Sequence, residues 1–137
     1  RAYGNALAGI RDTYYEEYKS APVESPSGTG LADPVFVEGL KRVSGIYLQM
    51  SKDIMALSVP YEIAGAHIEL ANNYLNSSIA LKEAVTNSDP LKSVTAFGGY
   101  ANFQANEFNT LEKISLYFKQ NGIIFTSDES GSFWNTQ

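Results

Sequence analysis

Apolar residues recur every three or four positions along four stretches of this chain, at about residues 2–19, 34–58, 61–86 and 90–121. That spacing places apolar side chains on one face of a helix, whereas a half-buried strand would alternate apolar and polar residues. The connections between the last three stretches are short, which indicates neighbouring helices that run antiparallel or, between the second and third stretches, a kinked continuation of one helix. The pattern therefore predicts an all-α protein, in which residues 1–122 form an antiparallel four-helix bundle.

Proline and glycine mark where these helices begin and end. Asp33–Pro34 and Asp89–Pro90 each open a helix, because an aspartate carboxylate accepts hydrogen bonds from the first turn and proline fits the first helical position. Pro60 disfavours helix at the residue before it, so the second helix should end near residue 58. Asn121–Gly122 is typical of a helix C-terminus.

Gly98–Gly99 lies in the middle of the fourth helix, where each glycine costs about 1 kcal/mol relative to alanine. We expect a packing reason to offset this cost, either the close approach of another helix or a bend. The residues that we expect to form the core stripes are Tyr3, Leu7, Ile10, Tyr14 and Tyr18 in the first helix, Val37, Leu40, Val43, Tyr47, Met50, Ile54 and Leu57 in the second, Ile63, His67, Leu70, Tyr74, Ser78, Leu81 and Val85 in the third, and Leu91, Val94, Phe97, Ala101, Phe108, Leu111, Ile114 and Phe118 in the fourth.

Two segments do not continue the helical pattern. Residues 20–32 contain two prolines, two glycines and four Ser or Thr residues, so they should form a loop that crosses the bundle or covers one end. Residues 123–137 should form a non-helical tail, with a β-prone run at Ile123–Thr126 and an aromatic pair at Phe133–Trp134. Two interpretations of the tail stay open: it folds back to close the end of the bundle, or it stays exposed and docks on a partner.

Composition narrows the range of partners. Charged residues make up 18% of the chain and hydrophobic residues 44%, and the net charge is -5. The ten Lys and Arg residues are scattered, whereas a nucleic-acid site needs clustered basic residues, so we expect no nucleic-acid partner. A polar but weakly charged surface is common in secreted and cell-surface proteins. We therefore expect an extracytoplasmic protein, secreted or held at a membrane only through an anchor upstream of Arg1.

The chain offers little catalytic or metal-binding chemistry. It has no cysteine, which excludes disulfides and thiolate metal sites. His67 is the only histidine and lies on the core stripe of the third helix, so we expect it to be buried and hydrogen-bonded rather than bound to a metal. A haem between His67 and Met50 or Met55, and a weak calcium site at residues 126–130, are the cofactor alternatives that the residue types leave open. We predict no catalytic residue, no metal and no cofactor, and hence a protein that is not an enzyme.

Tyrosine is the most unusual bias of the composition, with nine residues in the chain. Tyr14, Tyr15 and Tyr18 cluster near the end of the first helix, and tyrosine is over-represented at protein interfaces. Together with Phe133 and Trp134 they form the interface that we predict, either for a protein partner or for a homo-oligomer. The leading function is therefore structural, or the mediation of protein–protein contacts.

A second function stays open. Four-helix bundles hold ligands between facing helices, and His67 and Tyr74 are polar residues on the core stripe of the third helix. A small-molecule sensor that binds its ligand between helices near His67 is therefore the alternative.

The stretch of residues 60–100 combines a proline, a His-Ile-Glu-Leu run, an asparagine pair and an Asp-Pro-Leu helix start. The positions are Pro60, His67, Ile68, Glu69, Leu70, Asn72, Asn73, Leu81, Asp89, Pro90, Leu91 and Tyr100. In this pattern the chain resembles small helical extracytoplasmic proteins of candidate-phyla bacteria (Patescibacteria). The resemblance implies an exported helical domain, and it carries no catalytic activity.

Overall fold

The computed structural model describes residues 1–21 and 30–136, and all regular structure within these ranges is helical. The predicted all-α class is therefore confirmed. Four long helices are joined or followed by short 3-10 helices. In chain order the elements are α1 (Ala2–Lys19), η1 (Gly30–Ala32), α2 (Pro34–Met55), η2 (Tyr61–Ile63), α3 (Ala64–Thr86), α4 (Pro90–Gln120) and η3 (Ser130–Asn135).

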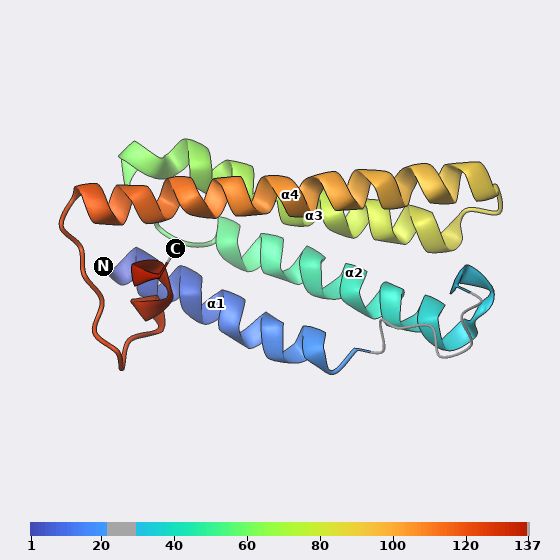
Figure 1. Ribbon diagram of the computed structural model, residues 1–137, viewed down its shortest axis with the longest axis horizontal. Coiled ribbons are helices and arrows are strands. Elements are labelled where there is room, and N and C mark those ends of the chain that lie inside the picture. The colour runs from blue at the N-terminus through green and yellow to red at the C-terminus, as the bar shows by residue number, and fades with distance from the viewer. Residues whose placement is uncertain (22–29, 137) are drawn as a thin grey trace.

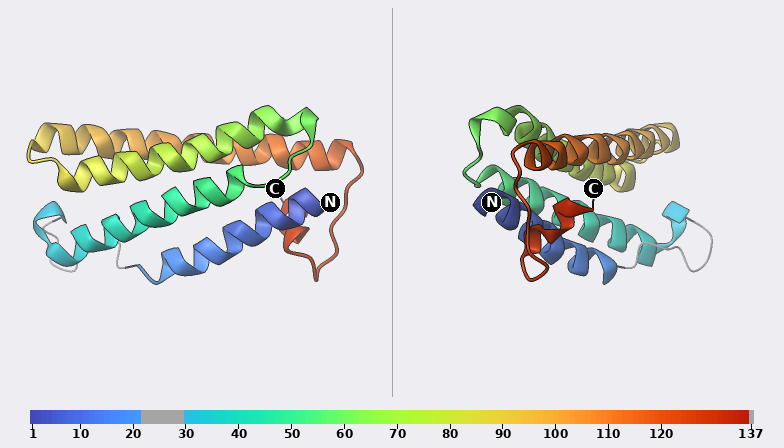
Figure 2. Two further views of the ribbon diagram at one scale, coloured as in Figure 1. Left: turned by 180° about the vertical axis from the view of Figure 1, so that it is seen from behind. Right: turned by 60° about the vertical axis from the view of Figure 1, so that its left-hand side comes forward.

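The four long helices lie side by side, roughly along the long axis of the molecule (Figure 1). α3 packs against both α2 and α4, and α1 packs against α2. The tail returns from the end of α4 to the beginning of α1, so both termini lie at the same end of the molecule (Figures 1 and 2). Buried residues of all four helices and of the tail form one hydrophobic core.

Both predicted Asp-Pro helix starts are present. The Asp33 carboxylate accepts a hydrogen bond from the N–H of Val35 at 2.9 Å, and the Asp89 carboxylate accepts one from the N–H of Leu91 at 2.9 Å. Each aspartate has an extended backbone, as expected for the residue that precedes the first helical turn. These two caps fix where α2 and α4 begin.

Two predicted bounds are corrected around Pro60. α2 ends at Met55 rather than near residue 58, and Tyr61–Ile63 form the 3-10 helix η2 instead of the first turn of α3. The N–H of Leu57 donates to the carbonyl oxygen of Ile54 at 3.0 Å, which is the tighter spacing common at the end of a helix. Pro60 precedes η2 and has no N–H to donate, so α2 and α3 cannot form one continuous helix through it.

The core face of α4 differs from the prediction. Leu91, Val94 and Phe108 were expected in the core, but they are 74%, 67% and 64% exposed. The physical reason is that α4 carries two faces, and in its first half the inward face is built from small polar and half-buried aromatic side chains. The buried residues of α4 are Ser93, Thr110, Leu111, Ile114, Ser115 and Phe118.

Of the two explanations expected for Gly98–Gly99, the close approach of another helix is wrong for the residues that the structure describes. Within the described residues, no side chain and no atom of another element lies within 4 Å of a Cβ placed on Gly98. For Gly99 the same holds except for the Phe103 ring of its own helix at 3.9 Å, so no other described helix approaches there. The close approaches occur instead at Gly4 and Gly131. A Cβ would lie 2.4 Å from the Phe125 ring at Gly4 and 2.2 Å from the same ring at Gly131. These two glycines let the tail pack directly on α1.

The tail folds back on the bundle and is partly helical, which corrects the prediction of a non-helical tail. Trp134, on η3, is 1% exposed; its indole N–H donates to the carbonyl oxygen of Gly4 at 2.9 Å. The Ser115 hydroxyl donates to the carbonyl oxygen of Trp134 at 3.1 Å. The β-prone run at Ile123–Thr126 forms no strand. These contacts make the tail part of the single core.

Most of the predicted loop at residues 20–32, namely residues 22–29, lies outside the described residues. Its last part forms η1. Within the ranges that the structure covers, none of the helices is both long and apolar enough to cross a membrane.

Candidate functional site

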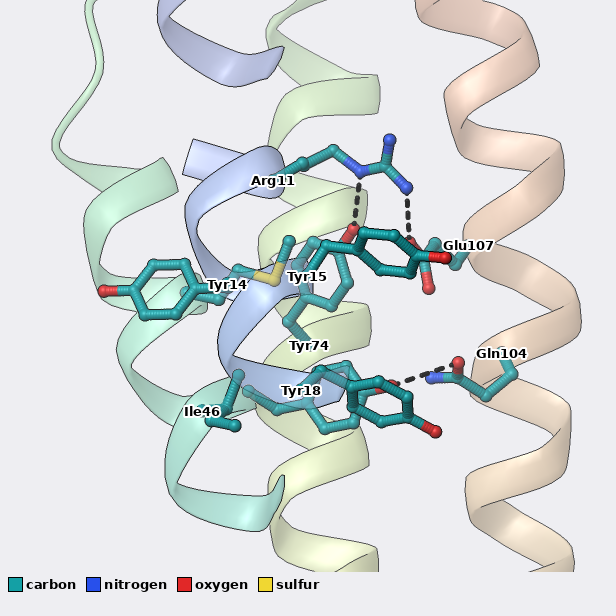
Figure 3. A pocket seen from close by; sticks show the side chains of 10 residues that line it. Arg11, Tyr14, Tyr15, Tyr18, Ile46, Tyr74, Gln104 and Glu107 are labelled. Atoms are coloured by element: carbon teal, nitrogen blue, oxygen red, sulfur yellow. Dashed lines mark hydrogen bonds and ion pairs between the residues drawn. The ribbon is translucent and has the colours of Figure 1, made fainter. Parts of the chain in front are cut away.

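A pocket of about 280 Å³ is lined by residues of all four long helices (Figure 3). Five of its ten lining residues are tyrosines from three different helices, and two others form a charged pair. We call it the tyrosine pocket. Its lining residues are Arg11, Tyr14, Tyr15 and Tyr18 of α1, Ile46, Tyr47 and Met50 of α2, Tyr74 of α3, and Gln104 and Glu107 of α4.

The charged pair joins α1 to α4 and lies largely out of solvent. A guanidinium nitrogen (Nη2) of Arg11 donates to Oε1 of Glu107 at 3.2 Å, and the two side chains are 21% and 16% exposed. Figure 3 shows the two side chains reaching toward each other across the pocket. Burial by itself lowers the pKa of Arg11, but the adjacent Tyr74 and Glu107 outweigh it and raise the pKa, so the guanidinium stays charged.

Tyr74 connects this pair to the core. Its hydroxyl donates to Oε1 of Glu107 at 2.6 Å and accepts a hydrogen bond from Nε of Arg11 at 3.2 Å. Burial raises the pKa of Tyr74, and the negative charge of Glu107 adds to the rise. Both hydrogen bonds to the carboxylate fall on Oε1, and within the described ranges none is found on Oε2. One carboxylate oxygen of Glu107 therefore keeps its acceptor capacity.

The tail supports Arg11 from the other side. The guanidinium carbon of Arg11 lies 4.7 Å above the centre of the Phe133 ring, within the range of a cation–π contact. Arg11 is thus held between a ring, a hydroxyl and a carboxylate. The folded tail helps to fix the geometry of the pocket, although Phe133 does not line it.

The Tyr47 hydroxyl forms a second set of polar contacts at the pocket. The Tyr47 hydroxyl donates to Oε1 of Gln104 and shares a hydrogen bond with the Tyr100 hydroxyl, each at 3.2 Å. The Tyr47 and Tyr74 rings stack with their centres 5.9 Å apart. Burial raises the pKa of Tyr47, and the neighbouring Tyr100 adds to the rise, so this phenol stays neutral.

Tyr14 stands at the edge of the pocket, toward α2. Its hydroxyl donates to the carboxylate of Asp53. Burial and this hydrogen bond raise the pKa of Tyr14 to about 12. Tyr14, Tyr47 and Tyr74 therefore act as neutral rings and hydrogen-bonding groups, because a raised pKa opposes their ionisation.

His67 is buried, as predicted, but it does not line the pocket. It is 3% exposed, and its Nδ1 lies 3.2 Å from the hydroxyl of Tyr3. Burial lowers the pKa of His67, which favours the neutral ring. The sequence predicted that His67 and Tyr74 could contact the same ligand. In the structure, Tyr74 lines the tyrosine pocket, whereas His67 lies outside it and contacts Tyr3 of α1.

Neither cofactor alternative is supported by an arrangement of ligands. Met50 lines the tyrosine pocket whereas His67 does not, and Met55 is exposed, so this pocket does not bring together the three residues considered for a haem. In residues 1–21 and 30–136, no group of three His, Cys, Asp or Glu side chains could hold a metal ion.

The residues predicted as an interface separate into two groups. Tyr14, Tyr15 and Tyr18 line the tyrosine pocket, with Tyr15 the most exposed of them. Phe133 lies half-buried beside Arg11, and Trp134 is buried within its own chain, where it cannot serve as an exposed anchor. The sequence missed Arg11, Gln104 and Glu107, because charged and amide residues ordinarily point outward from an amphipathic helix.

No family model, no curated protein and no solved structure matches this chain. The fold and the site together define a small all-α protein with a tyrosine-lined pocket between its helices.

Proposed function

We propose that this protein is a non-enzymatic antiparallel four-helix bundle that binds a small organic cation, an ammonium compound, in the tyrosine pocket. The observation that carries the proposal is the meeting of five tyrosine rings with the carboxylate of Glu107 around one opening of about 280 Å³. This develops the small-molecule alternative and moves the site from His67 to Tyr74.

Hydrogen bonds between helices support the antiparallel arrangement. The Ser44 hydroxyl donates to the carbonyl oxygen of Ser78, and the Ser51 hydroxyl donates to that of Ala71, each at 2.8 Å. The partner in α3 moves toward the beginning of α3 as the donor moves toward the end of α2. The ion pair of Lys113 with Glu69 and the hydrogen bonds of Tyr74 relate α4 to α3 in the same sense.

The chemistry of the lining favours a cation. Tyrosine rings carry negative charge on their faces and attract ammonium groups within about 6 Å. Oε2 of Glu107 supplies a carboxylate acceptor, while Arg11 is already engaged by Tyr74, Glu107 and Phe133. The net charge of -5 adds a long-range attraction for cations. The volume suits a ligand of metabolite size, just below the range of about 300–1,000 Å³ that is usual for larger ligands.

The same groups support a binding role rather than catalysis. A general acid or base works best with a pKa near neutral pH, and burial drives the pKa of Tyr47 and Tyr74 upward, away from it. We accordingly propose that the protein is not an enzyme.

We further propose an extracytoplasmic location, either secreted or attached through an upstream anchor. The support is the low share of charged residues, 18%, and the resemblance of residues 60–100 to exported helical proteins of Patescibacteria. Fractionation of the native host, with immunodetection of the protein outside the cytoplasm, tests this location; recovery with the cytoplasmic fraction contradicts it.

The binding proposal is tested by calorimetric titration with tetramethylammonium, and with tert-butanol as the neutral molecule of similar shape. We expect tetramethylammonium to bind and tert-butanol not to, because the rings and the carboxylate recognise charge. The variant Tyr15→Leu should weaken binding about tenfold, the scale of one cation–π contact. Tyr61→Leu, a change at an exposed tyrosine outside the pocket, is the matched control.

Two results contradict the binding proposal. Equal binding of tert-butanol means that the pocket recognises shape instead of charge. Binding of acetate in place of tetramethylammonium means that Arg11 recognises an anion. Because Tyr15 is mostly exposed, its replacement by leucine should leave the fold intact, and the melting temperature of the variant checks this.

Mediation of protein contacts is a second candidate function. It is favoured by the exposed apolar residues of α4, which are not part of the tyrosine pocket.

A further inference from the structure

α4 carries a second apolar face that points into solvent. Six exposed positions are spaced alternately three and four residues apart, which is the repeat of helices that pair in coiled coils. We call this face the outer stripe. Its residues are Leu91, Val94, Gly98, Ala101, Ala105 and Phe108.

Nothing within the described chain accounts for the outer stripe. Leu91, Val94 and Phe108 are more than half exposed, and no described side chain or other element comes within 4 Å of a Cβ placed on Gly98. Glycine in the middle of a helix lowers the stability of the helix. At Gly98, no contact within the described chain offsets this cost. The whole segment from Ser93 to Asn106 carries no charged residue. Depletion of charge and a contiguous apolar surface are typical of the centre of a protein interface.

The order of side-chain sizes indicates what covers this face. The large residues Leu91 and Phe108 stand at the two ends, and the small residues Gly98 and Ala101 stand on either side of the midpoint. Reversing a second helix of the same sequence places Leu91 opposite Phe108, Val94 opposite Ala105, and Gly98 opposite Ala101. A parallel copy would instead place Phe108 on Phe108 and leave a gap at the glycine.

We propose that the outer stripe is a self-association surface, on which α4 of a second copy of this chain lies antiparallel across a two-fold axis. Such an interface is self-complementary, because each residue meets the partner position that mirrors it. The close approach of two helices at Gly98 then supplies the packing reason that is missing within one copy. None of the six residues lines the tyrosine pocket, so this inference does not depend on ligand binding.

The length of the outer stripe indicates how stable the proposed dimer should be. Residues 91–108 span about 26 Å of helix at about 1.5 Å per residue. A single helix pair of this length buries less than the roughly 1,200–2,000 Å² of a stable complex, so the dimer should be weak and concentration-dependent.

Sedimentation velocity over a range of concentrations tests the proposal. We expect a monomer at low micromolar concentration and a growing dimer fraction toward millimolar concentration. Val94→Lys should weaken the dimer at least tenfold, because it places a charge in the stripe. Leu116→Lys, at an exposed apolar position of α4 outside the stripe, should leave the dimer unchanged. A strictly monomeric wild-type chain at millimolar concentration overturns the proposal, as does an equal effect of both variants.

The orientation is tested separately. Leu91→Lys combined with Phe108→Glu should restore the dimer that Leu91→Lys alone weakens, since an antiparallel pair brings the new charges together. A spin label at Asn109 should lie about 30 Å from its copy in the antiparallel pair, since about nineteen residues at about 1.5 Å separate the two labels along the axis. A label distance near 10 Å would mean parallel helices and would overturn the proposed symmetry. Circular dichroism confirms that each variant is folded.

Discussion

Arg11 and Glu107 are oppositely charged side chains that lie mostly out of water, and the hydroxyl of Tyr74 contacts both. When one member of such a pair is removed, the other is left with a charge that neither water nor a partner fully compensates. At a surface pair, water takes over that role. The difference can be measured within this chain, because Lys113 and Glu69 form an exposed pair at 2.8 Å.

We predict that Glu107→Leu or Arg11→Met alone lowers the free energy of unfolding by about 3 kcal/mol. The double variant should lose much less than the sum, because no unpaired charge remains. Urea denaturation of the two single variants and the double variant measures this. The same cycle on Lys113 and Glu69 should give a coupling below about 1 kcal/mol. Additive losses at Arg11 and Glu107 would show that the pair is not coupled.

Glycine substitutions separate close packing from open surface. Gly4→Ala should destabilise the protein by about 1–3 kcal/mol, because a Cβ at this position meets the buried ring of Phe125. Gly45→Ala, at an exposed site of α2 where no described side chain lies within 4 Å of the added Cβ, should stabilise it by up to about 1 kcal/mol. Gly98→Ala should behave like Gly45→Ala in the monomer, the opposite of what the sequence suggests. Thermal melts at low protein concentration compare the three variants.

His67 gives the stability a pH dependence of known sign. Burial holds the pKa of His67 below its ordinary value of 6.5, so the unfolded chain takes up a proton at pH values where the folded protein does not. Stability should therefore fall as the pH is lowered through about 6.5, and this loss ends below the folded-state pKa. Urea midpoints at about pH 7.5 and about pH 5.5 should differ less in His67→Gln than in the wild type. An unchanged difference would assign the pH dependence to other groups.

At the scale of the element, local sequence signals were sufficient to predict where the long helices lie, but not which face of each helix is buried. The Asp-Pro starts of α2 and α4 and the Asn121–Gly122 end of α4 could be predicted, because helix caps depend on residues that are neighbours in the sequence. The inward face of α4 could not be predicted, since the helix carries two apolar stripes and the packing of the other helices determines which one is buried. The η3 helix was missed because its six residues are stabilised by long-range contacts such as that of Trp134 with Gly4.

Replacing Trp134 tests how much the tail contributes to the free energy of unfolding. It is fully buried against α1 and α4, so Trp134→Ala should cost about 3–5 kcal/mol of unfolding free energy. Ile124→Ala, at an exposed position of the same tail, should cost less than about 0.5 kcal/mol. Chemical denaturation of both variants is the measurement. Equal, small effects would mean that the tail is not part of the core.

At the scale of the whole molecule, the tyrosine pocket exists only because four helices meet. Arg11 and Glu107 are 96 positions apart, and no local pattern marks either of them as inward-facing. The sequence could therefore predict a tyrosine cluster on α1 and a polar Tyr74 on α3, but not that they share one opening. The bundle positions the rings, and the tail holds Arg11 in place through Phe133.

The two methionines of this chain permit the most direct test of the account. Met50 lines the tyrosine pocket, whereas Met55 is exposed and lies outside it. With isotope-labelled methionine methyl groups, NMR spectra recorded during titration with tetramethylammonium should show a saturable shift of the Met50 signal. The Met55 signal should stay in place. A Met50 signal that does not move, or that moves only together with Met55, would contradict binding in the tyrosine pocket.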